Sequence, residues 1–421
     1  MSDITVDVTP HVLASRNFRL LWLGQAVSTF GDKFTEIAIP IFVFNLTGSA
    51  LQLGLAFLIQ TLAALLFGLL AGTLADRWDR RRTMIASDLL RALIVLSILS
   101  LSWLPWSING RLGALYVLAF LAAAVRQFFL PAKIATIPAT VAESQLMAAN
   151  SLDQSTMTLV GFLGFGVAGA LIELTGARVA FGIDAGTFVL SAVFIALMRL
   201  PRPEFAARAR QSVGADMMAG LRHVASVPIL VGTVVLSILA PLALGATQPL
   251  LLIFSREVLR GGDFGFGLLE GTFAIGVAFG AFVLGKIATN VPRGRLLALG
   301  VTGMGLGQLL GVAIPLALLT RVESGVVLMI ASLPFFFLGA ASNAAVFIGI
   351  RTIVQEASPR EMIGRVFGVI TVVSSTAIAA GASLAGLADV IGVGFIMLFW
   401  GGFLLVVGLL ALAWKAFRES K

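Results

Sequence analysis

Charged side chains lie within long apolar segments of this sequence, at positions where they could carry protons. Asp32, Lys33 and Glu36 fall between residues 18 and 45, and Arg126 falls in a later apolar segment. Asp32 and Glu36 are four residues apart and share one face of a helix, whereas Lys33 points about 100° away from Asp32 and can still reach Glu36. A carboxylate in a cavity of low dielectric can take up and release a proton, and an approaching arginine changes its proton affinity. We therefore predict that Asp32 and Glu36 couple to protons and that Arg126 is their partner.

A structural role for the same charges is the alternative. Two carboxylates against Lys33 and Arg126 would form a neutral cluster that locks helices together. Asp184, within another apolar segment, is expected to make a structural polar contact. Charges inside a membrane are costly and mark functional sites by default, so we favour the functional interpretation for Asp32 and leave both open for Glu36.

Further ionisable residues in apolar segments have simpler interpretations. Asp88 and Arg91 are three residues apart, and we expect a local ion pair with Arg91 extending toward the membrane surface. Glu270 has no charged neighbour in the sequence. It could bind a cationic substrate or a second proton, but we favour a place near the outer surface beside Arg256 or Arg260.

Several chemistries are excluded by what the sequence lacks. It has no cysteine, and its two histidines, His11 and His223, lie outside the apolar segments, so thiol chemistry and a histidine-rich metal site are excluded. No phosphate-binding loop of the pattern Gly-x-x-x-x-Gly-Lys-Ser/Thr occurs, so ATP hydrolysis is not expected. No set of nucleophile, base and metal ligands is visible. We therefore expect neither an enzyme nor a bound cofactor.

The elements that must position these charges are membrane-spanning helices. Of 421 residues, 58% are hydrophobic and only 12% are charged, and the mean hydropathy is +1.01. This surface must face lipid, and backbone groups in lipid are satisfied within helices. Twelve apolar segments are long enough to span. They cover about 18–45, 49–74, 83–104, 112–131, 152–175, 178–198, 228–254, 264–289, 295–319, 325–350, 364–388 and 391–414.

The distribution of basic residues predicts the orientation. An even number of spans places both termini on one side, and if that side is cytoplasmic, 21 of the 29 Lys and Arg residues fall in cytoplasmic segments and five in outer loops. This asymmetry agrees with the positive-inside rule. We expect a multi-pass protein of a bacterial-type inner membrane with both termini cytoplasmic. Because the basic residues lie in loops between spans, the net charge of +8 does not indicate nucleic acid.

An internal repeat divides the chain into halves. The stretch Gly72-Thr-Leu-Ala-Asp-Arg-Trp-Asp-Arg-Arg-Arg82 ends the second span, and a shift of 213 residues places it on Gly285–Arg295, which ends the eighth. We predict an all-α fold of two pseudo-symmetric six-helix bundles, residues 1–198 and 228–421, joined by a basic cytoplasmic linker, 199–227. Residues 214–224 of the linker could form a short surface helix. A site is expected at the interface of the halves near mid-membrane.

The stretch from Gly72 to Arg82 resembles the signature loop between spans two and three of the major facilitator superfamily, with Asp79 where the family usually has glycine. Further stretches are similar to its twelve-span drug:proton antiporter branch, which includes macrolide-efflux and enterobactin-exporter relatives. These are Asn17–Gln25, Gly31-Asp32, Asn45–Ser49, Pro131-Ala132, Ala149–Leu152 and Gly364–Phe367, and the glycines of the span-five antiporter motif remain in Gly161–Gly166 without its proline.

The resemblance implies a fold, a transport cycle and a gate. It implies the superfamily fold, alternating access and proton-driven export, and Arg126 corresponds to the span-four arginine that the family uses in coupling. It also implies that Gly72, Asp76, Arg77 and Arg80 form an inner gate that closes against Arg365 at the start of span eleven. Closing this contact would stabilise the outward-open state.

Polar residues within the spans are weak candidates for a substrate cavity, because a buried amide more often connects helices. The candidates are Gln60, Gln127, Gln248, Glu270 and Asn343.

Three functions remain open from the sequence. The first is a proton-coupled exporter of amphipathic or lipophilic small molecules such as drugs, macrolides or siderophore-like compounds. The second is a lipid or lysolipid flippase or an uncoupled facilitator, and the third is a non-transporting membrane sensor. The expected partners are a small-molecule substrate, protons and the lipid bilayer, with no nucleic acid, and a monomer is expected because one chain can enclose its own pathway.

Overall fold

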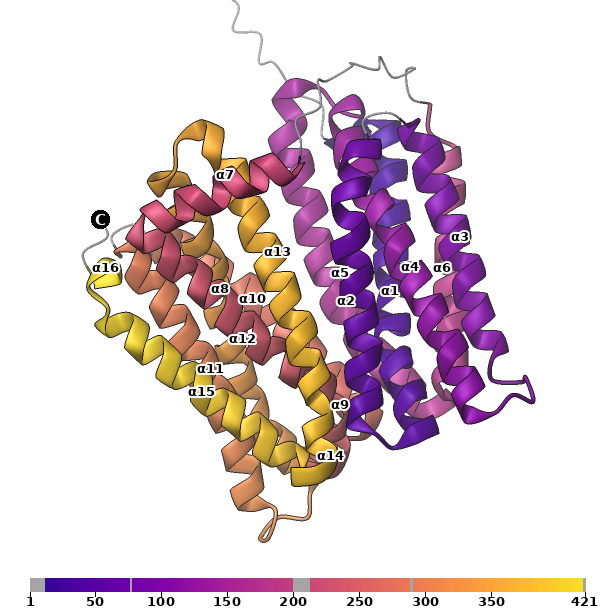
Figure 1. Cartoon of the computed structure of the whole chain (residues 1–421). Coiled ribbons are helices and arrows are strands. Elements are labelled where there is room, and N and C mark those ends of the chain that lie inside the picture. Colours follow the sequence, from indigo (N-terminus) through magenta and orange to yellow (C-terminus); the bar gives the residue numbers. More distant parts are fainter. Residues whose placement is uncertain (1–11, 76–77, 200–212, 288–290, 419–421) are drawn as a thin grey trace, which may run out of the picture.

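The computed structural model describes residues 12–75, 78–199, 213–287 and 291–418. It is helical throughout these ranges, and its long helices run back and forth between the two ends of the molecule (Figure 1). The N-terminal half consists of α1 (Arg16–Thr47), α2 (Ala50–Ala75), α3 (Arg80–Ser100), α4 (Ile108–Thr136), α5 (Leu146–Thr175) and α6 (Ala177–Ala196). The C-terminal half contains α8 (Pro228–Thr247), α9 (Leu251–Ile253), α10 (Gly262–Ile287), α11 (Arg293–Leu318), α12 (Gly325–Ala357), α13 (Arg360–Leu384), α14 (Ala388–Ile391), α15 (Val393–Ala413) and α16 (Lys415–Arg418).

Twelve long segments of helix agree with the number of apolar segments in the sequence. In the described part of the chain, eleven are long and apolar enough to cross a membrane. The twelfth is α1, with 32 residues. It differs from the other eleven in charge, because Asp32, Lys33 and Glu36 all lie near its centre. The helix that departs from the others is therefore the one that carries the candidate proton carriers.

Turn residues stop the helices where the sequence changes from apolar to polar. Gly48 ends α1 in the left-handed conformation (φ 62°), and its amide bonds back to the carbonyl of Phe44. Such a φ favours glycine because it has no Cβ. Ser15 caps the start of α1 through a hydrogen bond from the amide of Phe18. We refer to the two ends of the molecule by these residues, the Ser15 end and the Gly48 end.

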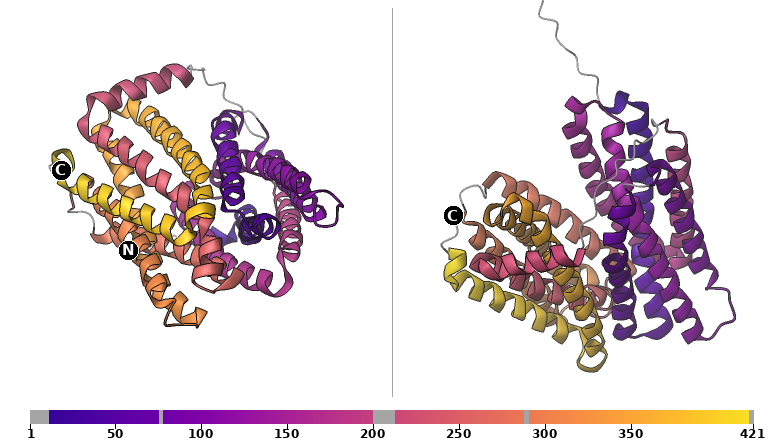
Figure 2. Two further views of the ribbon diagram at one scale, coloured as in Figure 1. Left: turned by 60° about the horizontal axis from the view of Figure 1, so that its bottom comes forward. Right: turned by 45° about the horizontal axis from the view of Figure 1, so that its top comes forward.

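The helices separate into two bundles, which Figure 2 shows as an indigo-to-magenta group and a rose-to-yellow group. Within the first, α1 packs against α5 and α6, and α3 against α4 and α6. Within the second, α11 packs against α12 and α15, and α8 against α13. The two bundles contact each other mainly where α5 meets α10 and where α2 meets α13.

Glycines allow the closest helix contacts, because they have no side chain to hold two helices apart. A Cβ at Gly305 of α11 would lie 2.2 Å from the backbone nitrogen of Leu405 in α15. A Cβ at Gly381 of α13 would lie 2.0 Å from the carbonyl oxygen of Leu242 in α8. At these crossings backbone packs on backbone, which no larger residue would permit without a shift.

The second part of the predicted linker forms a helix, as the sequence indicates. Helix α7 (Val213–Ser226) lies across the Ser15 end and packs on α13 (Figure 1). A Cβ at Gly220 would lie 2.8 Å from the carbonyl oxygen of Arg365. The linker helix is therefore tied to the C-terminal bundle at the start of α13.

The span that begins with α8 is irregular in its last third. After Thr247 it continues as a 3-10 turn, η4 (Gln248–Leu250), then α9, then a π-helical segment, η5 (Phe254–Val258). Pro249 cannot donate a backbone hydrogen bond, which favours the break at this place. Such irregular backbone in a spanning segment is tolerated where it faces protein or a cavity.

Candidate functional site

A cavity of about 530 Å³ lies between the two halves. All six long helices of the N-terminal half contribute to its wall, and η4, α10 and α13 close it from the other side. Its charged and amide lining residues are Asp32, Glu36, Gln60, Arg91, Arg126, Gln127, Asp184, Gln248 and Glu270. The sequence-based prediction of a site at the interface between the halves therefore corresponds to a cavity with charged walls.

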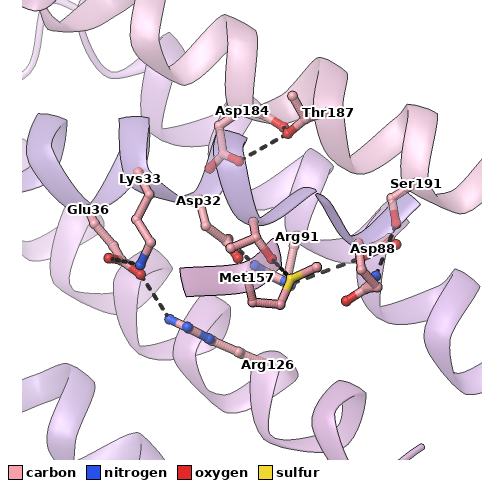
Figure 3. Close-up of polar contacts among 12 residues, drawn as sticks. Asp32, Lys33, Glu36, Asp88, Arg91, Arg126, Met157, Asp184, Thr187 and Ser191 are labelled. Carbon is pink, nitrogen blue, oxygen red and sulfur yellow. Dashed lines mark hydrogen bonds and ion pairs between the residues drawn. The ribbon is translucent and has the colours of Figure 1, made fainter. Parts of the chain in front are cut away.

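Asp32 pairs with Arg91, a residue that the sequence assigned elsewhere. The Arg91 guanidinium forms an ion pair with the Asp32 carboxylate and lies 3.9 Å from Asp88 Oδ1 (Figure 3). It also lies over the ring of Phe188 in α6, 3.9 Å from the centroid. The prediction that Arg91 extends toward the membrane surface is wrong, because its side chain is buried and points inward to α1. The expected Asp88–Arg91 pair is present.

Glu36 contacts two cations at once. Lys33 Nζ donates to Glu36 Oε2 at 2.6 Å, and Arg126 Nη1 donates to Oε1 at 3.3 Å (Figure 3). The Arg126 side chain is 54% exposed although it belongs to the middle of α4, so the cavity surface around it is accessible. Arg126 therefore meets the carboxylates of α1, as the sequence predicted, and its direct partner is Glu36.

Asp184 adds a further carboxylate to the same wall. It lies almost fully buried on α6, one turn from Thr187. The Thr187 hydroxyl donates to the Asp184 backbone carbonyl at 2.7 Å and lies 3.4 Å from its carboxylate Oδ1 (Figure 3). A Cβ at Gly31 would meet Thr187 Oγ1 at 1.8 Å and Asp184 Oδ1 at 2.9 Å. Gly31 is thus what lets α6 approach α1 next to Asp32.

The C-terminal half contributes one carboxylate to the cavity. Gln248 Nε2 donates to Glu270 Oε1 at 2.6 Å. The favoured placement of Glu270 beside Arg256 or Arg260 near the surface is wrong. Arg256 binds Asp263 instead, and Arg260 donates to the carbonyl of Glu323. Glu270 points into the cavity because η4 and α10 face each other there.

The predicted cavity amides differ in their surroundings. Gln60 and Gln127 line the cavity, and each donates to the carbonyl four residues earlier on its own helix, Ala56 and Ala123. Asn343 is not among the lining residues. It is buried between α12 and α11, where its amide nitrogen lies 3.4 Å from the sulfur of Met304.

The predicted gate is described only in part. Asp76 and Arg77 lie outside the described residues, and Gly72 belongs to the last turns of α2. Arg80 Nη1 donates to the carbonyl of Ala135 at 2.8 Å, which joins α3 to the end of α4. Arg365 lies in the second turn of α13 with Nη1 3.5 Å from the sulfur of Met362. Asp79 caps α3 by accepting from the amide of Arg82 at 2.8 Å, which explains a carboxylate at this position.

Among the described residues no group of three or more His, Cys, Asp or Glu side chains is arranged to hold a metal ion. The ionisable groups on the cavity wall are carboxylates and arginines, which can bind protons and exchange ion-pair partners.

Sequence reasoning missed the wall that α3 and α6 supply. Arg91, Phe188 and Asp184 all line the cavity, and Phe165 of α5 lies under Lys33 at 4.6 Å from the ring centroid. The distance of Arg91 from the start of its helix is a feature of the sequence that could have placed it next to Asp32. At 1.5 Å per residue, Arg91 lies about 16 Å into α3 and Asp32 about 24 Å into α1, so both are mid-membrane rather than at an edge.

Comparison with known proteins gives consistent results over the whole chain. Residues 21–382 match the model of the Major Facilitator Superfamily. The chain is 30% identical to an uncharacterized MFS-type transporter of Bacillus subtilis (strain 168), over 95% of this chain and 94% of the relative. It is 27% identical to macrolide efflux protein A of Streptococcus pyogenes, with 93% and 94% covered, and to the enterobactin exporter of Escherichia coli O1:K1, with 88% and 84% covered.

A solved structure supports the fold. The nucleoside transporter NupG superposes with a TM-score of 0.74 at 13% sequence identity, covering 96% of this chain and 99% of that protein.

Proposed function

This chain belongs to the major facilitator superfamily, a family of membrane transporters rather than enzymes, and we propose that it is a proton-coupled exporter of amphipathic or lipophilic small molecules. The observation that carries the proposal is the set of ion-paired carboxylates, Asp32 and Glu36, on the wall of a cavity between the halves. A charge at this depth is costly unless it is used. Alternating access of such a cavity to the two membrane faces would carry both substrate and protons.

Asp32 is the proposed proton carrier. Its direct ion-pair partner is Arg91, whereas Glu36 is held by both Lys33 and Arg126. Protonating Asp32 removes one attraction and frees Arg91, which still has Asp88 within 3.9 Å. Protonating Glu36 would leave two cations without their shared anion. The site can therefore exchange a proton at Asp32 with the smaller rearrangement, and Glu36 keeps Arg126 on the cavity wall.

The cavity fits an organic molecule of moderate size. Its volume of about 530 Å³ lies within the range of about 300–1,000 Å³ that ligand pockets have. Phe57, Phe165, Phe188 and Phe266 supply aromatic surface, and Glu270 supplies an anion whose hydrogen-bond partner is the neutral Gln248. Two of the relatives are named for the efflux of macrolides and the export of enterobactin, which supports export of organic small molecules. Glu270 would select those that carry a positive charge.

We propose that the Ser15 end faces the cytoplasm of a bacterial cell, with both termini there. The basic residues of the loops support this orientation. Contacts between the halves gather at the Gly48 end, as between Arg256 and Asn45. With this orientation the cavity is closed on the outer side, which is the state in which an exporter would load from the cell. Residues 1–198 and 228–421 would act as the two moving halves of a monomer, with 199–227 as their linker.

The inner gate is carried over from the resemblance as part of the proposal. Gly72, Asp76, Arg77 and Arg80 would close against the start of α13 at Arg365. Helix α7 lies at the same place, since Gly220 touches the Arg365 backbone. Movement of α13 during the cycle would therefore carry the linker helix with it.

Proton flux in reconstituted vesicles tests the proposal. Wild type, Asp32→Asn and the control Glu356→Gln would be compared while lumenal pH is followed on adding candidate amphipathic substrates. Glu356 forms an ion pair with Arg293 away from the cavity and is 49% exposed, so its variant should behave as wild type. We expect substrate to evoke proton movement in wild type and in Glu356→Gln, and none in Asp32→Asn.

Two other outcomes would replace the proposal. Substrate movement without proton flux, unchanged in Asp32→Asn, would make the charged cluster structural and the protein a facilitator or a flippase. No movement of any candidate, lysolipids included, would favour a membrane sensor.

A further inference from the structure

Two carboxylates bind the first turns of long helices that belong to the opposite half. Asp389 of α14 accepts hydrogen bonds from the backbone amides of Ala50 and Leu51, at 2.6 and 3.1 Å, and from the Ser49 hydroxyl at 2.8 Å. These donors form the start of α2, a helix of 26 residues in the N-terminal half. In Figure 1, α14 lies beside the lower end of α2.

Glu173 makes the corresponding contact, but here the carboxylate belongs to the N-terminal half and the amides to the C-terminal half. It lies near the end of α5 in the N-terminal half, and its Oε2 accepts from the amides of Asp263 and Phe264 at 2.6 and 3.3 Å. These amides begin α10 in the C-terminal half. Gly262 precedes them with φ of 61°, and a Cβ there would lie 2.6 Å from Glu173 Oε2. Glycine is therefore required at this position both for the turn and for access of the carboxylate.

The two sets of amides are equivalent in the internal repeat. The shift of 213 residues that relates the halves carries Ala50 to Asp263 and Leu51 to Phe264. The helix crossings next to them obey the same shift. Gly54 of α2, whose Cβ would lie 2.2 Å from the Ala382 carbonyl, maps to Gly267 of α10, which lies against Gly169 of α5. Gly169 in turn maps to Ala382.

The carboxylates themselves are not equivalent. The same shift carries Glu173 to Gly386 and places Gly176 opposite Asp389. One carboxylate belongs to the last turns of a long helix, and the other to a short helix that follows one. Each half therefore supplies its carboxylate from a different position of the repeat, and each carboxylate binds the equivalent pair of amides in the other half. A contact that was only inherited with the repeat would use matching positions.

Electrostatics favour this contact in one state of the molecule. A helix N-terminus carries a partial positive charge and unsatisfied amides, so a carboxylate there is stabilising. Arg256 neutralises Asp263, with 2.7 Å from Nε to Oδ1, and its Nη1 reaches Asn45 of the other half at 2.7 Å. Opening the Gly48 end would separate α2 from α14 and α5 from α10, and every one of these hydrogen bonds between the halves would be lost.

We infer that Asp389 and Glu173 are positioning residues for transport, a pair of reciprocal latches that hold the Gly48 end closed. Because the latches are made only when that end is closed, they stabilise this state relative to the state open at the Gly48 end. Removing a latch should shift the population toward the second state without changing the cavity. The inference concerns the conformational equilibrium alone and does not depend on the identity of substrate or coupling ion.

Distance measurement between spin labels tests the latches in the full-length protein. The chain has no cysteine, so labels react only at Trp106→Cys and Val326→Cys, which place them at exposed residues of opposite halves near the Gly48 end. In this background we would compare Asp389→Asn, Glu173→Gln, the double variant and Glu257→Gln in lipid nanodiscs. Glu257 is an exposed carboxylate at the same end, in η5, and serves as the control.

We expect each single variant to raise the ratio of long to short distances by about twofold to fivefold, the range that corresponds to one carboxylate at a helix N-terminus. The double variant should have a higher ratio of long to short distances than either single variant, because the two latches hold different helix pairs together. Glu257→Gln should have the same ratio as wild type. Melting temperatures measured on the same samples would identify any variant that is merely misfolded, and Asp389→Ala and Glu173→Ala would then replace it. Distance distributions of the folded double variant that equal those of wild type would overturn the inference.

Discussion

The guanidinium of Arg91 forms an ion pair with the carboxylate of Asp32, and this contact joins α3 to α1 within the N-terminal half. The Arg91 side chain is only 7% exposed and is also close to Asp88, which is fully buried. Arg91 is thus close to two carboxylates: Asp32, which faces the cavity, and Asp88, which is buried away from it. When Asp32 is protonated, Arg91 still has the Asp88 carboxyl group 3.9 Å away.

Loss of Arg91 should therefore be far more costly for the fold than loss of Arg126. Arg91→Leu removes the cation beside Asp32 at the cavity and beside the fully buried Asp88, and because Asp88 has no access to solvent we expect about 3–5 kcal/mol of lost stability. Arg126 is 54% exposed to the cavity and pairs with a carboxylate that also has Lys33, so Arg126→Leu should cost less than about 1 kcal/mol. Thermal unfolding in detergent, followed by tryptophan fluorescence, compares the two variants directly. Equal melting temperatures would contradict the conclusion that Arg91 contributes more to the stability of the fold than Arg126 does.

The positions of the spans could be predicted because hydropathy is a local property of the sequence. The predicted segment 228–254 corresponds to α8 and its irregular continuation to Val258, and 325–350 corresponds to α12, which extends to Ala357. The extension was missed because Arg351 and Glu356 are charged and fall where α12 projects beyond the apolar segment. Charged residues lower the local hydropathy and so end the predicted span, but the helix continues through them.

The partners of the charged residues could not be predicted in the same way. In a soluble helix the apolar face shows which side is buried, but in a membrane both the lipid face and the packed face are apolar. The rotation of α3, and with it the direction of Arg91, was therefore undetermined. Contacts within one helix do not depend on how the helix is rotated about its axis, so the contact of Lys33 with Glu36 was predicted correctly. The direction of Glu270 likewise depended on how η4 faces α10.

Two glycines of α5 offer a matched test of helix contact. A Cβ at Gly164 would lie 2.9 Å from Lys33 Cγ and 3.3 Å from the Phe30 carbonyl, whereas Gly166 has nothing within 4 Å. Gly164→Ala should destabilise the protein by about 1–3 kcal/mol through overpacking against α1. Gly166→Ala should be neutral or stabilising by about 0.5–1 kcal/mol, because alanine is the better helix former. The melting temperature of Gly164→Ala should therefore be lower than that of Gly166→Ala. A lower melting temperature for Gly166→Ala would contradict the packing described here.

Glu270 should decide which substrates bind by their charge. Its carboxylate lines the cavity with a neutral hydrogen-bond partner, Gln248, and so it can attract a cation without breaking an ion pair. We expect Glu270→Gln to weaken binding of a lipophilic cation, tetraphenylphosphonium, by about tenfold or more, which is the effect of losing one charged contact. Binding of the neutral triphenylphosphine oxide should change by less than about threefold. Quenching of tryptophan fluorescence during titration of each compound gives both affinities.

Glu356→Gln is the control for that titration, since its carboxylate lies away from the cavity and its loss should leave both affinities at the wild-type values. A wild-type protein that binds the two compounds equally would show that Glu270 is not exposed to substrate as an anion. Equal weakening of both compounds in Glu270→Gln would mean that the side chain shapes the cavity instead of attracting charge. Weakening of the cation alone is the result that assigns selectivity to the C-terminal half, opposite the ion-paired carboxylates of α1.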